Sequence, residues 1–203
     1  MGIVIIFLAT SMPLFSQNYQ AQANTLIAQA AALGPPAGLK YLISTNWQYG
    51  ARGCAVKLSK TNPTAAANIL IAIAQRLIIY ANTTREQRRI ENPRDPIQPF
   101  RYKYWQEAIY QLSLADRYIR IVSKTNPQLA ANMAFQIAGI YYNNIPQNPN
   151  YKAYRRNYRA QARTHLQSSN TVSALTYAKK IKNKAQRLAM INRIKTQHKI
   201  WKL

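Results

Sequence analysis

The chain has 203 residues, enough for one domain or a short array of repeats, and 48% of them are apolar, which excludes a chain disordered by composition. Only 5 acidic residues accompany its 28 lysines and arginines, so the net charge is +23, and no acidic residue follows position 116. Because internal ion pairs cannot neutralise such a chain, the charge predicts an anionic partner: nucleic acid, a membrane surface, a cell-envelope polymer or an acidic protein.

An uncharged apolar stretch, residues 2–15, opens the chain. It is shorter than the roughly 20 residues of a membrane-spanning helix and matches the apolar part of a signal peptide. Ala21 and Ala23 would supply the small residues of a cleavage site, although no lysine or arginine precedes the stretch. Residues 1–23 are therefore predicted to be a signal peptide, which favours export to a periplasm or the cell surface. The alternative is a hydrophobic N-terminal helix of an intracellular or organellar protein.

Residues 24–203 are predicted to form a single α-helical repeat domain whose C-terminal part, 151–203, is basic. Apolar residues recur at intervals of three and four, which indicates an all-α fold. The predicted helices are Tyr19–Leu33, Ala37–Leu58, Pro63–Asn82, Phe100–Lys124, Pro127–Tyr142, Tyr151–Gln167 and Thr171–Lys195, with a connecting loop over residues 83–99. Cys54, the single cysteine, is predicted to be a small buried side chain.

Two segments of the chain are nearly the same. Ser59–Ala74 and Ser123–Ala138 are identical at ten of sixteen positions, and each contains Thr-Asn-Pro, in which asparagine suits an N-cap and proline the first helical position. The duplication (59–74 and 123–138) predicts stacked helical hairpins. The repeated alanines, Ala66, Ala67 and Ala74 with Ala130, Ala131 and Ala138, would let helix axes approach closely. Asn68 and Asn132 are predicted to be buried amides.

The segment Ser173–Ile194 places alanine and leucine pairs on either side of a turn that contains arginine. Together with the duplication, this pattern resembles the helical-hairpin repeats of tetratricopeptide-like α-solenoids. The resemblance implies a right-handed stack of helical hairpins, an architecture that usually serves as a scaffold or a binding surface.

Catalytic chemistry has little support in the sequence. The two histidines, His165 and His198, are far apart, no cluster has metal-ligand spacing, and no glycine-rich loop could cradle a phosphate. Glu107 and Asp116 are nine residues apart, about 13 Å along a helix, which is too far for an acid–base pair on one helix. The sequence therefore predicts a protein that is not an enzyme and needs no metal or cofactor.

The candidate binding residues are basic and aromatic. On a helix, Lys152, Arg155, Arg156, Arg159 and Arg163 would share one face and bind anions, while Tyr151, Tyr154 and Tyr158 would lie beside them, either stacking on a ligand or filling the core. A second group of candidate anion-binding residues comprises Lys179, Lys180, Lys182, Lys184 and Arg187. Trp201 would contact a partner or cover the last apolar layer.

Three functions remain open at this stage. The first is a non-catalytic exported scaffold or adaptor that binds an envelope polymer or an acidic protein through its basic face. The second is an intracellular or organellar nucleic-acid-associated structural protein, such as a peripheral ribosomal component. The third is a protein held at a membrane surface, and in each case assembly into a larger complex is plausible.

Overall fold

The computed structural model describes residues 14–91, 99–144 and 168–202, and within these ranges it contains helices and turns but no strand. The predicted all-α class is therefore confirmed. The helices are α1 (Leu14–Leu33), α2 (Leu39–Ile43), α3 (Ala51–Leu58), α4 (Pro63–Glu91), α5 (Pro99–Thr125), α6 (Pro127–Asn144), the helix over residues 168–179, and α8 (Lys184–Lys202).

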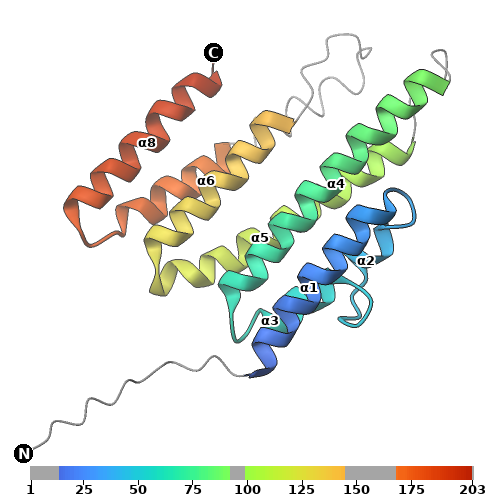
Figure 1. Cartoon of the computed structure of the whole chain (residues 1–203). Coiled ribbons are helices and arrows are strands. Elements are labelled where there is room, and N and C mark those ends of the chain that lie inside the picture. The colour runs from blue at the N-terminus through green and yellow to red at the C-terminus, as the bar shows by residue number, and fades with distance from the viewer. Residues whose placement is uncertain (1–13, 92–98, 145–167, 203) are drawn as a thin grey trace, which may run out of the picture.

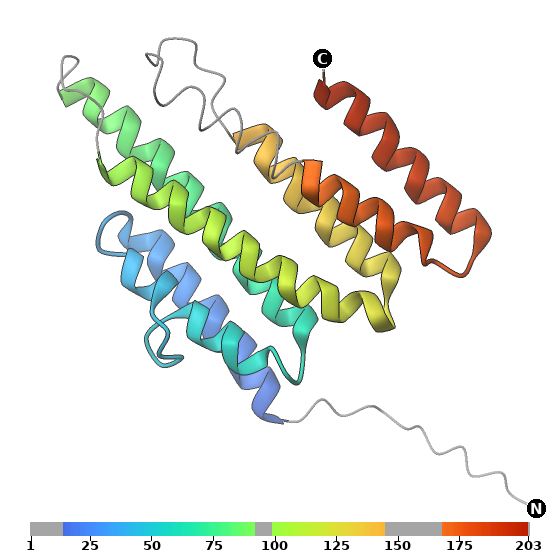
Figure 2. The same ribbon diagram turned by 180° about the vertical axis from the view of Figure 1, so that it is seen from behind.

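The helices are arranged as a stack of neighbouring pairs (Figure 1). At one end α1 packs on α3 and α4, and the long helices α4 and α5 form the centre of the stack. The α6 helix follows with helix 168–179 beside it, and α8 forms the opposite end, as Figure 2 shows from behind. The predicted packed hairpins are present.

Two predicted helices are each broken in two. Ala37–Leu58 is divided into α2 and α3, because Ser44 adopts an extended conformation (ψ 136°) and the Asn46 side chain accepts a hydrogen bond from Gln48 N at 3.0 Å. Thr171–Lys195 is divided into helix 168–179 and α8 by a turn at residues 180–183. In both places an asparagine side chain bonds to the backbone and replaces helical hydrogen bonds.

The predicted boundaries elsewhere are closer to the structure, with one exception. The helix predicted to end at Asn82 continues to Glu91, so half of the predicted loop 83–99 is helical. The first helix ends at Leu33 as predicted, and Gly34 follows it in the left-handed conformation (φ 63°), which glycine adopts without steric cost.

Three helices begin with the same arrangement of hydrogen bonds. The side-chain oxygens of Asn62, Asn126 and Asn183 each accept from the backbone N–H three residues later, at 3.0, 3.0 and 3.1 Å. Their carbonyls accept from the N–H four residues later, at 3.1, 3.1 and 2.9 Å. The caps expected at Asn62 and Asn126 are confirmed. Asn183 caps a third helix, α8, within Ser173–Ile194, where the sequence pattern indicates a helical hairpin but did not identify the cap; we call the segments that begin at Asn62, Asn126 and Asn183 the first, second and third units.

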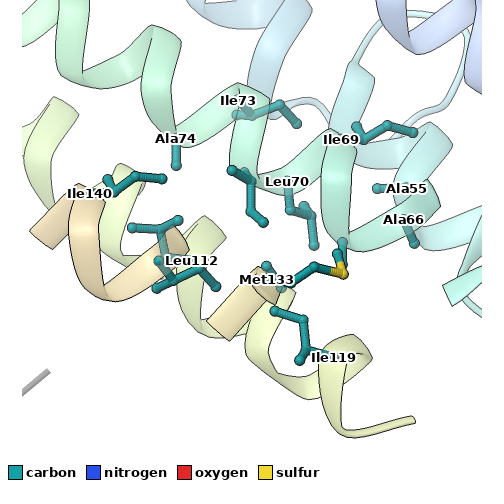
Figure 3. Close-up of a cluster of buried hydrophobic side chains, with 14 of the residues drawn as sticks. Ala55, Ala66, Ile69, Leu70, Ile73, Ala74, Leu112, Ile119, Met133 and Ile140 are labelled. Carbon is teal, nitrogen blue, oxygen red and sulfur yellow. The ribbon is translucent and has the colours of Figure 1, made fainter. Parts of the chain in front are cut away.

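The duplicated alanines are packed as predicted. All six of them, Ala66, Ala67, Ala74, Ala130, Ala131 and Ala138, are fully buried. Figure 3 shows Ala66 and Ala74 among side chains from four helices: Ala55 of α3, Ile69, Leu70 and Ile73 of α4, Leu112 and Ile119 of α5, and Met133 and Ile140 of α6. Small side chains bring the backbones of neighbouring helices together, and the larger ones fill the space between them.

The prediction for the duplicated asparagines is wrong. Asn68 and Asn132 are both exposed. Asn68 lies on the same narrow strip of α4 as the exposed Gln75, on the side of the helix that no neighbour covers. Because α4 is buried on most of its circumference, apolar residues surround Asn68 in the sequence, and the exposed strip cannot be recognised from the sequence pattern.

The first helix is part of the core from its middle onward. Ala23, Leu26 and Ala30 are buried, and the Tyr80 hydroxyl of α4 donates to the Ala30 carbonyl. Tyr19 packs edge-to-face on Trp47, with ring centroids 5.3 Å apart. The α1 helix thus continues through the predicted cleavage site and buries residues on both sides of the cut.

Candidate anion-binding surface

The sequence predicted two groups of anion-binding residues, and the structure describes one of them. Lys152, Arg155, Arg156, Arg159, Arg163, Tyr151, Tyr154 and Tyr158 lie outside the described residues. Trp201 belongs to the last turn of α8, and its side chain is likewise outside them. Lys179, Lys180, Lys182, Lys184 and Arg187 all lie in residues 179–187, which we call the basic turn; it comprises the last residue of helix 168–179, the turn at 180–183 and the first turn of α8.

The basic turn presents its four lysines to solvent. Lys179, Lys180, Lys182 and Lys184 are all exposed, while Ile181 between them is buried and attaches the turn to the core. Lys184 is the first residue of α8, where the positive end of the helix dipole adds to the lysine charges. The turn therefore combines a fixed backbone with mobile charged side chains, an arrangement suited to an extended anionic surface.

Arg187 has a different role from the lysines. It is half-buried, and its Nη1 donates to the carbonyl of Ile181 at 3.0 Å. One of its donors thus holds the turn closed, and the remaining donors can face a ligand. Lys180 lies over the ring of Tyr177, with Nζ 5.9 Å from the ring centroid, which ties this charge to the end of helix 168–179.

Neither acidic side chain that the structure describes lies in the basic turn. Glu107 of α5 accepts from Arg52 of α3 at 2.9 Å and from Gln111 at 2.5 Å. Its side chain is 24% exposed and that of Arg52 is 17% exposed, so this ion pair links two helices within the fold. The carboxylate is used internally and leaves no charge to offset the lysines at the other end of the stack.

Asp116 is also paired within the fold. Its Oδ2 accepts from Nη2 and Nε of Arg120 at 2.8 and 3.1 Å, and its side chain is 17% exposed. Burial raises the pKa of Tyr141 and Tyr177, and the nearby negative charge of Asp116 raises both further. Asp116 thus forms an ion pair one turn along α5 and lies near the buried tyrosines of α6 and helix 168–179.

The α8 helix extends the basic surface beyond the turn, through further residues of the C-terminal part that the sequence predicts to be basic. Lys195 and Lys199 are exposed, and Arg193 lies over the ring of Phe135 with its Cζ 5.4 Å from the centroid. Leu188 is 48% exposed between the lysines. The sequence signal for these residues is Asn183. If Asn183 is taken as a third N-cap, α8 begins at Lys184, and the spacing of its apolar residues then indicates which side of the helix is buried and which is exposed.

Candidate metal ligands are not grouped in the part of the chain that the structure describes. No three His, Cys, Asp or Glu residues there are placed to hold a metal ion. The thiol of Cys54 is buried as predicted, donates to the Trp47 carbonyl at 3.2 Å, and has its pKa raised to about 11 by burial. A buried thiol of this kind is a poor nucleophile at neutral pH.

One described helix segment, Pro63–Thr83 of α4, is long and apolar enough to cross a membrane. However, 67% of this segment is buried inside the fold, where α5 packs along it. The burial accounts for its apolar composition, as expected for the central helix of a stack.

The chain matches no protein-family model, no curated protein and no solved structure.

Proposed function

We propose that this chain is a non-catalytic helical-repeat scaffold or adaptor, built as a tetratricopeptide-like stack, that binds an anionic partner through the basic turn and α8. The observation that carries the proposal is that the acidic side chains the structure describes are already ion-paired with arginines of the same chain. Both described carboxylates, Glu107 and Asp116, are paired inside the fold, whereas the lysines of the basic turn have no acid among their own residues. Like charges held this close repel each other, and an anion binding across them removes that repulsion.

The charge type favours a broad surface over a selective pocket. Lysine is a compact and strongly hydrated charge that contacts an anion without the fixed two-point geometry of arginine. The partner is therefore an extended polyanion, such as an envelope polymer or the acidic face of a protein, and release of counterions makes binding strongly dependent on salt.

Export is part of the proposal, with a mature chain that begins near Asn24. One observation favours the second candidate, an intracellular or organellar nucleic-acid-associated protein. The α1 helix passes unbroken through Ala21–Ala23, and Tyr19 and Ala23 pack against the rest of the stack. The intact mass of the native protein distinguishes the two: a loss of 23 residues supports export, and a retained N-terminus in a soluble fraction supports the second candidate.

The binding proposal is tested by a triple substitution in the basic turn. We expect K179Q/K182Q/K184Q to weaken binding to poly-L-glutamate. Affinity should also fall less steeply with salt: the magnitude of the negative slope of log affinity against log salt should decrease by about two to three. The measurement is fluorescence anisotropy with labelled poly-L-glutamate over a salt series, with circular dichroism to confirm unchanged helicity.

The matched control is K57Q/K60Q/K124Q, which removes the same total charge at three exposed lysines: Lys57 at the end of α3, Lys60 in the turn after it, and Lys124 at the end of α5. We expect this control to change the slope by less than about one, because its three lysines are divided between two turns, whereas the basic turn gathers four lysines within six residues. Equal effects of the two triple variants would contradict the proposal, since they would show a response to net charge alone.

A further inference from the structure

The three asparagine caps place α4, α6 and α8 in one register, so that equivalent positions can be compared by their distance from the cap. Seven residues after the cap stand Ile69, Met133 and Met190, and eleven residues after it stand Ile73, Ile137 and Ile194. All six side chains are buried. This side of each helix therefore packs into the stack in the same way in all three units.

A second strip behaves differently in the third unit. Five and twelve residues after the cap, α4 has Ala67 and Ala74, and α6 has Ala131 and Ala138; these four are fully buried by neighbouring helices. The equivalent residues of α8 are Leu188 and Lys195, and both are exposed. The strip that is a helix–helix contact in the first two units is uncovered in the third, at the end of the stack (Figure 1).

On the uncovered strip one exposed apolar side chain lies among lysines. Lys184, Leu188, Lys195 and Lys199 follow one another at intervals of four, seven and four residues, so they lie along one side of α8; we call them the outer strip. Intervals of four and seven are those of a seam between two helices. Leu188 is 48% exposed, and packing it against an apolar side chain would remove that surface from water.

We propose that the outer strip of α8 binds an acidic amphipathic α-helix of a partner protein, which takes the place of the next helix in the stack. This inference rests on the proposed function and names the partner class and its site. The lysines select glutamates and aspartates on the flanks of the partner helix, and Leu188 selects an apolar residue in its centre.

Charge argues against a second copy of this chain as the occupant. Residues 117–203 contain no acidic residue, so another α8 would place lysines against lysines. A nucleic acid would satisfy the lysines but would leave Leu188 against a charged backbone, where its burial gains little. The acidic helix is the occupant that uses both kinds of side chain in the outer strip.

The test compares two synthetic peptides of three heptads that differ only in their apolar face. One has leucines on one side of the helix and glutamates on the flanks, and the other has glutamine in place of every leucine. We expect the full chain to bind the leucine peptide about tenfold more tightly than the glutamine peptide, because only the former can cover Leu188 and its half-buried neighbour Ile191. Affinities are measured by fluorescence anisotropy, with an oligothymidylate of equal charge as a third probe.

Substitution of Leu188 locates the binding site. Leu188→Gln should reduce the preference for the leucine peptide to about twofold, whereas Leu33→Gln should leave it unchanged. Leu33 is a matched control, because it is a 52% exposed leucine of α1 at the opposite end of the stack. Both substitutions are on the surface, and circular dichroism checks that helicity is kept.

The outcomes separate this inference from the proposed function. If the two peptides bind equally and both respond to the basic-turn variant, the anion-binding function stands and the acidic-helix partner is wrong. If oligothymidylate binds more tightly than the leucine peptide, the occupant is a nucleic acid and the inference is overturned. If no probe binds, both proposals fail.

Discussion

The turns at Asn126 and Asn183 are closed by the same hydrogen bonds, but the helices that follow them have different surroundings. After Asn126, α6 is covered on several sides, and its alanines allow that close contact. After Asn183, α8 is covered on one side only and has the exposed Leu188 and Lys195 where α6 has the buried Ala131 and Ala138. The asparagine cap thus defines where a helix begins. The side chains five and twelve residues after the cap show whether another helix covers that side of it.

This difference has a general physical reason. A stack of hairpins must end, and its last helix needs a polar outer face to stay soluble. Lysine at an otherwise apolar position meets that need and also prevents further copies of a basic chain from adding to the end. The same residues are those to which the proposed acidic helix would bind.

The largest expected effect on stability comes from exchanging the residues at equivalent positions of α6 and α8, Ala138 and Lys195. Ala138→Lys should lower the free energy of unfolding by about 3 kcal/mol or more, because it places a charge at a fully buried position. The reverse exchange at the equivalent position, Lys195→Ala, should change it by less than about 0.5 kcal/mol. Urea unfolding followed by circular dichroism measures both. Similar effects at the two positions would mean that the α6 and α8 strips do not differ in packing.

Much of the fold was predictable, because local chemistry and packing agree in the first two units. The Thr-Asn-Pro segments contain both an N-cap and a proline at the first helical position, and the alanines after them fit a close helix contact. The prediction failed where a turn lacks such signals. Ser44–Gly50 and residues 180–183 have no proline, so the apolar periodicity on either side predicts one continuous helix. For residues 180–183 the alanine and leucine pairs of Ser173–Ile194 do indicate a turn, but not where it lies.

The candidate site was only partly predictable. Clustered lysines are visible in the sequence, but the exposure of Leu188 depends on which side of α8 packs on the stack, and that depends on the cap at Asn183. Asn68 and Asn132 show the same limit, since a polar residue inside an apolar repeat can be either a buried amide or a single exposed position. Only the arrangement of neighbouring helices decides between the two.

An intermediate effect is expected from removing the caps. Asn126→Ala and Asn183→Ala should each lower the free energy of unfolding by about 1 kcal/mol, because each deletes the acceptor for one N–H of the first helical turn. Asn132→Ala is the control, since it makes the same change at an exposed position inside α6 and should cost less than about 0.5 kcal/mol. A cost at Asn183 no greater than at Asn132 would contradict the equivalence of the two caps.

The smallest expected effect concerns the proline that α8 lacks. Pro63 and Pro127 are the first residues of α4 and α6, whereas α8 begins with Lys184. Lys184→Pro should raise the free energy of unfolding by about 0.4–1 kcal/mol, because proline suits the first helical position and restricts the unfolded chain. Lys184→Ala is measured beside Lys184→Pro, because both substitutions remove a positive charge at the positive end of the helix dipole.

If Lys184→Pro is more stable than Lys184→Ala, the backbone after Asn183 has the conformation of the other two caps. If it is less stable, the third turn shares their hydrogen bonds but not their backbone geometry, and the register that places Leu188 and Lys195 on the uncovered strip would need to be revised.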